Sequence, residues 1–310
     1  MSNYFKILRP GINSTFQDLG RFGLQHLGIV PSGCMDKTLF SLSNKLVGNQ
    51  VSEGALEFAY QGPLLELAGE SALVAVSGKV NFNIINKNGE TKHGTHNESF
   101  VISNGDKIDI ISTIDSVYGY LSIFGGFKLK EIKGSVSTLV RAKIGPNNGE
   151  KLQSEEKIFF NKSALASKTK KIKFNLDKDN TIRVMTGLQF NYFSKKSQEN
   201  FFSKEYKVSR LTDRMGMRLE GEKLENKVNK NIKSEGITKG SIQIPGDGQP
   251  IVLLSDHPTI GGYPKIANVI TADYDKLVQK NPGSKLKFKL VDLAVAESAF
   301  QTYTKILNSF

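Results

Sequence analysis

The first half of the chain is a succession of short apolar or alternating runs, closely spaced and separated by turn residues. Turn signals such as Asn88-Gly89 and Asn104-Gly105 stand between these runs. Because parallel strands need long crossover connections, the close spacing favours an antiparallel barrel or sandwich over βαβ units. The predicted strands are residues 4–8, 55–60, 63–67, 72–77, 80–86, 98–103, 107–112 and 117–124.

A helix is predicted to interrupt these strands at residues 35–47. Its apolar side chains recur at helical spacing, at Leu39, Leu42 and Leu46. Ser32 or Asp36 is suited to cap the start of the helix, and Gly48 is suited to end it. The free backbone N–H groups at such a helix start favour an anion.

The segment that leads into this helix is rich in both glycine and polar side chains. Its glycines are Gly11, Gly20, Gly23, Gly28 and Gly33. A loop with this many glycines needs unusual backbone angles or close backbone approach. The polar residues between them are Gln17, Asp18, Arg21, Gln25, His26, Ser32 and Asp36. Because functional side chains are often carried on loops held by a rigid scaffold, we expect a functional site here.

The polar, lysine-rich segment 162–180 marks the expected boundary between two domains, residues 1–165 and 181–310. The second half is again predicted to be mainly strands, at 181–185, 204–208, 241–244, 251–255 and 285–291. Residues 273–279 are predicted to form a short helix. The stretch 292–307 is predicted to be a docked helix, because one face is apolar: Leu293, Ala296, Phe300, Tyr303 and Leu307.

The composition is typical of a soluble globular protein, with 310 residues, 38% hydrophobic and 23% charged. The single cysteine, Cys34, excludes an intramolecular disulfide, so we expect a reducing, cytoplasmic setting. The net charge of +12 comes mainly from dispersed lysines, without a basic helix or an aromatic RNA-binding signature, so no nucleic-acid partner is expected. No apolar run approaches the ~18 residues of a membrane span, and the first residues do not form a signal peptide.

Two further segments carry candidate binding chemistry. Residues 210–218 hold three arginines and one carboxylate, which could grip a carboxylate or phosphate, or form ion pairs along a surface strand. Residues 239–269 place polar side chains between glycines and prolines, and a predicted strand delivers Asp256 to its end. The polar residues of this segment are Gln243, Asp247, Gln249, Asp256, His257, Thr259, Tyr263 and Lys265.

Several familiar sites are missing from the sequence. It has neither a P-loop nor a dinucleotide-binding glycine motif, and it lacks the nucleophile elbow of α/β-hydrolases. No biotin attachment sequence is visible, so any link to biotin would run through a partner. No metal is expected, because the histidines lack zinc-ligand spacing: His26, His93, His96 and His257.

Three motifs follow one another along the chain. They are PGINSTFQDLGRFGLQHLGIVPSGCMD, SRLTDRMGMRLEG and GSIQIPGDGQPIVLLSDHPTIGGYPKI. Together they resemble the carboxyltransferase-like family known as allophanate hydrolase subunit 2 or KipA-like proteins, and the resemblance covers essentially the whole chain. Within that family, the chain is similar to the C subunits of bacterial 5-oxoprolinases.

The resemblance implies a mainly β fold of two cyclophilin-like β-barrel domains with a few short helices. It also implies that the chain forms a complex with the two other subunits of the 5-oxoprolinase. These are a KipI-like B subunit and a LamB/YcsF-like A subunit. That complex uses ATP to open 5-oxo-L-proline to L-glutamate. Two alternatives stay open. One is a biotin-dependent carboxyltransferase acting on urea or a similar amide, and the other is a non-enzymatic, KipA-like regulator that binds a KipI-like partner.

Residue chemistry suggests roles for the polar side chains in this reaction. The arginines are suited to clamp anionic groups, and the loop amides near Ser32 and Gly33 are suited to stabilise an oxyanion. Asp18, Asp36 and Asp256 are the candidates for a base or an orienting carboxylate. The candidate substrate-binding residues are Gln17, Arg21, Gln25, Ser32, Gly33, Arg210, Asp213, Arg214, Arg218, Gln243, Gln249, Thr259, Gly261, Gly262, Tyr263 and Lys265. The glycine-rich loop and residues 256–265 are expected to lie close together.

Overall fold

The computed structural model describes residues 2–161, 169–177, 179–227 and 231–310, and it is mainly β, with 33% strand and 19% helix. The chain divides into two compact units. The first comprises Met1–Arg21, Ser32–Leu176 and Phe310, and the second comprises Phe22–Pro31 and Asp177–Ser309. One of the passages between the units, from Leu176 to Asp177, falls inside the lysine-rich segment. The domain bounds expected from the sequence stay a prediction.

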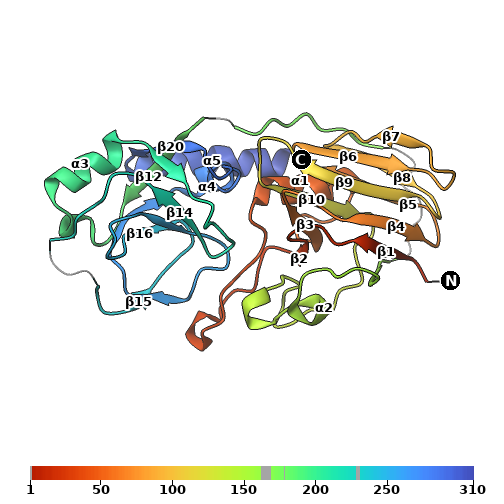
Figure 1. Ribbon diagram of the computed structural model, residues 1–310, viewed down its shortest axis with the longest axis horizontal. Helices are drawn as coiled ribbons and strands as arrows, with labels where there is room; N and C mark the ends of the chain where they lie inside the picture. The colour runs from red at the N-terminus through yellow and green to blue at the C-terminus, as the bar shows by residue number, and fades with distance from the viewer. Residues whose placement is uncertain (1, 162–168, 178, 228–230) are drawn as a thin grey trace. The chain divides into compact units, whose positions relative to one another are not determined.

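The first unit contains two antiparallel sheets, ordered β11-β1-β4-β9-β6-β7 and β2-β3-β10-β5-β8 (Figure 1). Their bounds are β1 Tyr4–Arg9, β2 Thr15–Gln17, β3 Ala55–Ala59, β4 Leu64–Ala68, β5 Ala72–Ser77, β6 Val80–Ile85, β7 Thr91–His93, β8 Glu98–Ile102, β9 Lys107–Thr113, β10 Tyr118–Ile123 and β11 Lys157–Phe159. Every strand expected in this half is confirmed. The sequence analysis missed the short strands β2, β7 and β11.

The core of the first unit lies between these two sheets, because apolar residues of both form one buried cluster, including Phe58, Leu67 and Phe82. Strand β5 is buried along its whole length. Its alternate residues belong to different clusters: Val74 and Val76 pack in the core between the sheets, while Leu73 and Ala75 pack with the apolar residues of helix α1, Lys37–Val47. A strand covered on both faces has a continuous apolar sequence, which explains the unbroken run ALVAVS.

Helix α1 begins and ends as its sequence predicts. The Asp36 side chain accepts a hydrogen bond from the Leu39 backbone N–H at 2.8 Å, which makes Asp36 the N-cap. Gly48 ends the helix in the left-handed conformation, with φ 84°. The remaining short helical elements outside the second barrel are η1 Gln25–Leu27, η2 Val140–Ala142 and α2 Pro146–Gly149.

The second unit is built on a closed barrel of strands ordered β12-β19-β16-β17-β14-β13-β20. Their bounds are β12 Thr181–Thr186, β13 Tyr206–Val208, β14 Gly216–Glu220, β16 Ser241–Gln243, β17 Ile251–Leu253, β19 Lys265–Val269 and β20 Lys285–Leu290, with a small separate sheet of β15 Glu235–Gly236 and β18 Ile260–Gly261. The parallel pairing of β12 with β20 closes the barrel. Strands β15, β18 and β19 were not predicted from the sequence, and β14 lies in the segment for which a surface strand was one of two alternatives.

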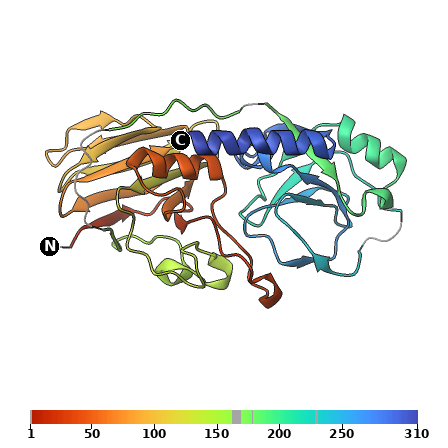
Figure 2. The same ribbon diagram turned by 180° about the vertical axis from the view of Figure 1, so that it is seen from behind.

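Three α-helices accompany this barrel: α3 Lys195–Ser203, α4 Thr271–Val278 and α5 Leu293–Ser309, together with the short η3 Phe190–Tyr192. Helix α5, the long blue helix in Figure 2, was expected to dock through an apolar face. Tyr303 on that face is buried and donates a hydrogen bond to Asp275 of α4 at 2.8 Å. Leu293 and Phe300 are 58% and 49% exposed, so the apolar face is only partly covered. Among the described helices, none combines the length and apolar character that a membrane crossing requires.

Candidate functional site

The glycine-rich loop of the first unit is anchored by Asp18. Its carboxylate accepts hydrogen bonds from Gly20 N at 2.8 Å, Ser135 Oγ at 2.7 Å, Val136 N at 2.8 Å and Ser137 Oγ at 2.5 Å. A carboxylate offers about four lone-pair sites. Three of these contacts end on Oδ1 and one on Oδ2, so the carboxylate is held mainly through one oxygen. Its role as a base or as an orienting carboxylate stays a prediction.

Gln17 and Arg21 flank Asp18 and are both buried. The Gln17 amide donates to Thr15 Oγ1 at 2.9 Å and to the Thr138 carbonyl at 3.1 Å. The Arg21 guanidinium donates to the Ser137 carbonyl. Both side chains therefore tie the loop to the segment around Ser137 instead of reaching into solvent.

The end of this loop has a backbone that favours glycine. Ser32 and Gly33 have φ values of 57° and 91°. A Cβ atom at Gly33 would lie 2.9 Å from the Leu19 carbonyl carbon. The neighbouring Cys34 N–H donates to the Asp18 carbonyl at 2.8 Å. Gly33 thus permits a close backbone approach, as the density of glycines in the sequence predicted.

Behind the start of α1 lies a buried polar group formed by Glu57 and Tyr120. Tyr120 donates to Glu57 Oε2 at 2.6 Å and accepts from the Asp36 N–H at 2.9 Å. The Met35 N–H also donates to Glu57 Oε2, at 2.8 Å. Burial, reinforced by the Glu57 carboxylate, raises the pKa of Tyr120 well above its usual value. Sequence reasoning missed both residues because they lie inside strands that read as apolar.

The second unit contains a partly buried ion pair between two predicted residues. Arg214 donates to Asp256 through Nε at 2.9 Å and through Nη2 at 3.0 Å. Their side chains are 16% and 8% exposed. Arg214, proposed as a clamp for an anionic group, is therefore bidentate on Asp256, one of the proposed bases.

The other residues of the arginine motif do not gather around this pair. Arg210 and Arg218 are exposed, and Arg218 alternates with the inward-facing Met217 and Leu219 on β14. Asp213 accepts hydrogen bonds from the Met215 and Gly216 N–H groups, so it shapes a turn.

A second polar cluster surrounds Lys265, which is 3% exposed. Its ammonium donates to Glu235, and its backbone N–H donates to Gln189 Oε1 at 3.1 Å. The Gln189 amide donates in turn to Glu235 at 2.9 Å. The bond from Lys265 is the main reason that the pKa of Glu235 lies below its usual value. Gln243, the register partner of Lys265, is 5% exposed.

Glu235 and Gln189 were not selected from the sequence. A signal was available, since Lys265 begins a buried strand and a buried ammonium needs a carboxylate partner. The residue that supplies it could not be read from sequence distance, because Glu235 lies on a separate small sheet.

The remaining predicted residues differ in their hydrogen bonds and in their exposure to solvent. The Gln249 side chain accepts from Gly221 N at 2.9 Å and donates to Gly221 O at 3.1 Å, which closes a turn. The carbonyls of Thr259 and Gly262 accept backbone hydrogen bonds from Ile237 and Ile232. Tyr263 is 40% exposed, and Gln25 lies exposed on η1. The roles assigned to all these residues, and the expected closeness of the loop to residues 256–265, stay predictions.

Next to Asp256, the structure adds a buried histidine. His257 is 4% exposed, and its Nδ1 lies 2.7 Å from the Pro258 carbonyl oxygen. Because a carbonyl oxygen can only accept a hydrogen bond, Nδ1 carries a proton and donates this hydrogen bond. Burial lowers the pKa of His257, with a smaller contribution in the same direction from the charge of Lys239. The imidazole is therefore held neutral at neutral pH.

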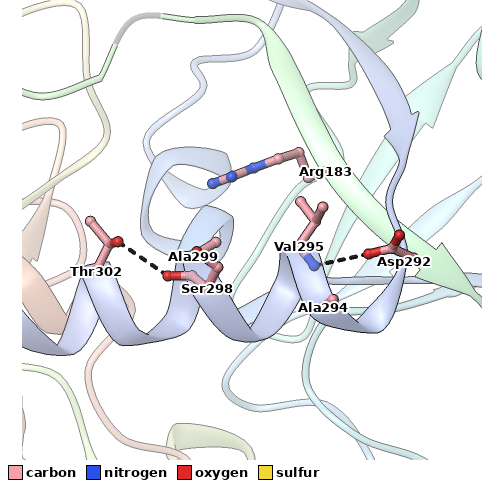
Figure 3. A pocket seen from close by; sticks show the side chains of 7 residues that line it. All are labelled: Arg183, Asp292, Ala294, Val295, Ser298, Ala299 and Thr302. Carbon is pink, nitrogen blue, oxygen red and sulfur yellow. Dashed lines mark hydrogen bonds between the residues drawn. The ribbon is translucent and has the colours of Figure 1, made fainter.

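Two grooves, one in each unit, are lined by other residues. Figure 3 shows a groove of about 500 Å³ in the second unit, lined by Arg183 and by one face of α5. Arg183 is itself bidentate on Asp273. A smaller pocket of about 250 Å³ in the first unit combines Phe16 and Leu152 with Lys128. Within the described part of the chain, no group of three or more histidine, cysteine or acidic residues is placed to hold a metal ion.

Comparison with known proteins gives a consistent result. Residues 27–290 match the family described as carboxyltransferase domain, subdomain A and B. The chain is 34% identical to the C subunit of 5-oxoprolinase from Haemophilus influenzae, over 94% of this chain and 92% of that protein. It is 31% identical to the C subunit of 5-oxoprolinase from Escherichia coli, over 96% and 94%. The crystal structure of Kluyveromyces lactis urea carboxylase superposes with a TM-score of 0.89 at 28% identity, covering 99% of this chain and 29% of that one.

Proposed function

Since the chain belongs to the carboxyltransferase domain family, we propose that it is the C subunit of an ATP-dependent 5-oxoprolinase that opens 5-oxo-L-proline to L-glutamate. One observation carries the proposal: the similarity to two bacterial 5-oxoprolinase C subunits extends over nearly the full length of both proteins. Activity is proposed for the complex, not for the isolated chain.

The proposed reaction explains why ATP is required. Water opens the lactam by adding to its carbonyl carbon and breaking the C–N bond, but a lactam carbonyl is a weak electrophile. Transfer of a phosphoryl group from ATP to the carbonyl oxygen makes the carbon more electrophilic, and the phosphate then leaves as the acid forms. The intermediate is anionic, which suits the positive net charge of the chain. ATP is held by the complex, whose other members are a KipI-like protein and a LamB/YcsF-like protein.

Within this chain, the two buried clusters of the second unit are the proposed substrate-facing groups. Arg214 and Asp256 supply a fixed ion pair, and Lys265 supplies an ammonium held by Glu235.

The test is reconstitution. The chain is co-expressed with its KipI-like and LamB/YcsF-like partners, and 5-oxoproline-dependent ADP release is measured together with glutamate formation. The proposal expects one glutamate for each ADP, and no ADP when 5-oxoproline is omitted. ADP release from a complete complex that does not respond to 5-oxoproline would exclude it.

A second candidate is favoured by the superposition on urea carboxylase. Under this alternative the chain is a carboxyltransferase that moves a carboxyl group from biotin, supplied by a partner, to urea or a similar amide. The assay for it supplies a carboxylated biotin carrier and urea, and measures loss of the carboxyl group from the carrier. Urea-dependent loss, without 5-oxoproline-dependent ADP release, would establish the alternative.

A further inference from the structure

Gln243 and Lys265 stand side by side inside the second unit. They are Cα partners on the antiparallel strands β16 and β19, so their side chains leave the sheet on the same side. The register skips one residue next to this pair, because Ile242 pairs with Ala267 while Gln243 pairs with Lys265. Such a bulge redirects side chains, and bulges are frequent beside active sites.

The pair carries more hydrogen-bond donors than the described chain uses. An ammonium has three donors, and within the described residues Glu235 alone accepts from Lys265 Nζ. The Gln243 Nε2 atom is buried and has no partner within the same part of the chain. Unsatisfied buried donors cost free energy, so a buried donor without a partner calls for an explanation. A ligand oxygen would satisfy both groups.

The cluster is built to hold the donors still. The Gln189 side chain donates a hydrogen bond to Glu235 and accepts one from the Lys265 backbone N–H. Gln189 therefore holds the Glu235 carboxylate in place beside the Lys265 ammonium. Gly261 pairs with Glu235 on the adjacent small sheet. A Cβ atom on Gly261 would lie 2.6 Å from Gln243 Nε2, so a glycine at this position leaves room for the amide.

The cluster also reaches the protein surface through Glu235. The Glu235 side chain is 37% exposed, although Lys265 and Gln243 are buried. Ile260 and Tyr263, which flank Gly261 and Gly262, are 60% and 40% exposed. The donors therefore lie beneath a partly apolar surface, which is a usual setting for a small-ligand site.

We propose that Gln243 Nε2 and Lys265 Nζ together bind the carbonyl oxygen of an amide-type ligand. The charge balance selects this class, because Glu235 already neutralises Lys265 and the cluster carries no excess positive charge for a carboxylate. A neutral carbonyl oxygen, with two lone pairs, accepts from both donors without adding charge. One donor releases this oxygen before it takes the phosphoryl group in the proposed reaction. The inference deepens the proposed function and rests on it, since the lactam of 5-oxoproline is such a group, as is urea under the alternative.

The direct test is observation of the Gln243 side-chain amide by NMR in the full chain labelled with ¹⁵N. Its signal is assigned as the one lost in Gln243→Glu. The probes are 2-pyrrolidone, a lactam without a carboxylate; urea; and acetate, a carboxylate without an amide. We expect 2-pyrrolidone to shift the Gln243 signal and acetate to leave it unchanged. A larger shift with urea than with the lactam would point to the alternative function.

Gly261→Ala is a second test of the inference, and Gly236→Ala is its matched control. The first places a methyl group against the Gln243 amide, whereas a Cβ at Gly236 meets nothing within 4 Å. Both glycines lie on the same small sheet, and neither has a positive φ. Gly261→Ala is expected to abolish the lactam-induced shift, while Gly236→Ala keeps it. In the active complex, Gly261→Ala is expected to raise KM for 5-oxoproline by about tenfold, the effect of one lost hydrogen bond.

Two outcomes overturn the inference. One is a shift of the Gln243 signal caused by acetate but not by 2-pyrrolidone or urea, which would show that the two donors bind a carboxylate. The other is the absence of any shift with all three probes. The NMR measurement needs neither ATP nor partners, so an inactive complex would defeat the proposed function and leave this result standing. If the complex is active but no probe shifts the Gln243 signal of the chain, the inference is wrong and the proposed function stands.

Discussion

Arg214 and Asp256 are joined by two parallel hydrogen bonds, and the Asp256 N–H also donates to the Arg214 carbonyl at 2.9 Å. The side chains and the backbones of the two residues thus support one another. A bidentate pair of this kind fixes both groups in one geometry. It also leaves a buried charge behind when either partner is removed.

Arg214→Ala is accordingly expected to lower the free energy of unfolding by about 3 kcal/mol, because Asp256 stays buried without its partner. Urea denaturation of the full chain measures the change. The control is Arg218→Ala, which removes an exposed arginine nearby and is expected to change stability by no more than about 0.5 kcal/mol. Equal effects of the two substitutions would show that the ion pair contributes nothing specific.

Asp18→Asn tests whether Asp18 anchors the loop. The variant places an NH₂ group where the carboxylate accepts from four donors, so at least one contact becomes a clash between donors. We expect the free energy of unfolding to fall by about 2 kcal/mol. Any loss of activity is expected to accompany this loss of stability. A variant as stable as the parent but inactive in the reconstituted complex would instead make Asp18 a chemical participant. Glu155→Gln, which breaks an exposed ion pair with Lys6, is the matched surface control.

Gly33→Ala and Gly23→Ala separate two costs of losing a glycine. Both positions have positive φ, at 91° and 79°. A Cβ at Gly33 would meet the backbone of Leu19, whereas a Cβ at Gly23 meets nothing within 4 Å. Gly23→Ala is expected to cost about 1 kcal/mol from backbone strain alone. Gly33→Ala is expected to cost clearly more, as measured by thermal unfolding, and similar costs would refute the close approach at Leu19.

The buried His257 predicts a specific dependence of stability on pH. An unfolded histidine takes up its proton near pH 6.5, and folded His257 takes it up at a lower pH. Between those values the unfolded state binds more protons, so stability falls as the pH is lowered from 6.5. His257→Asn keeps a donor for the Pro258 carbonyl but cannot titrate, and it should flatten the curve in this window. His93→Asn, which alters an exposed histidine on β7, should leave the curve unchanged.

Local patterns predicted most of the elements. The longer strands of the first unit could be predicted because each carries its own alternation or apolar run, and α1 because Asp36 and Gly48 cap a leucine stripe. Helix α3 was missed because its sequence, KKSQENFFS, offers only Phe201 and Phe202 as apolar residues and so no stripe. Strand β14 was predicted only as an alternative, a surface strand, because Arg218 within it also fits a binding motif and the alternation of Met217 and Leu219 is short.

The pairings within the candidate site were beyond local reasoning. The sequence showed that Arg214, Asp256 and Lys265 were chemically suited to a site, but the choice of partner depends on barrel register. Strand β14 pairs with β17, which brings the ends carrying Arg214 and Asp256 together. Glu235 reaches Lys265 from a separate small sheet. Such contacts between residues far apart in the chain leave no periodic trace in the sequence.

The parallel pairing of β12 with β20 also has a consequence for synthesis. Strand β12 leaves the ribosome first, and its partners on both sides, β19 and β20, are made long after it. Until they emerge, its backbone N–H and C=O groups have no strand to pair with, and they offer an edge to other chains. The barrel therefore cannot close until β20 has been made. We expect the second unit to be the part of the nascent chain that depends most on chaperones.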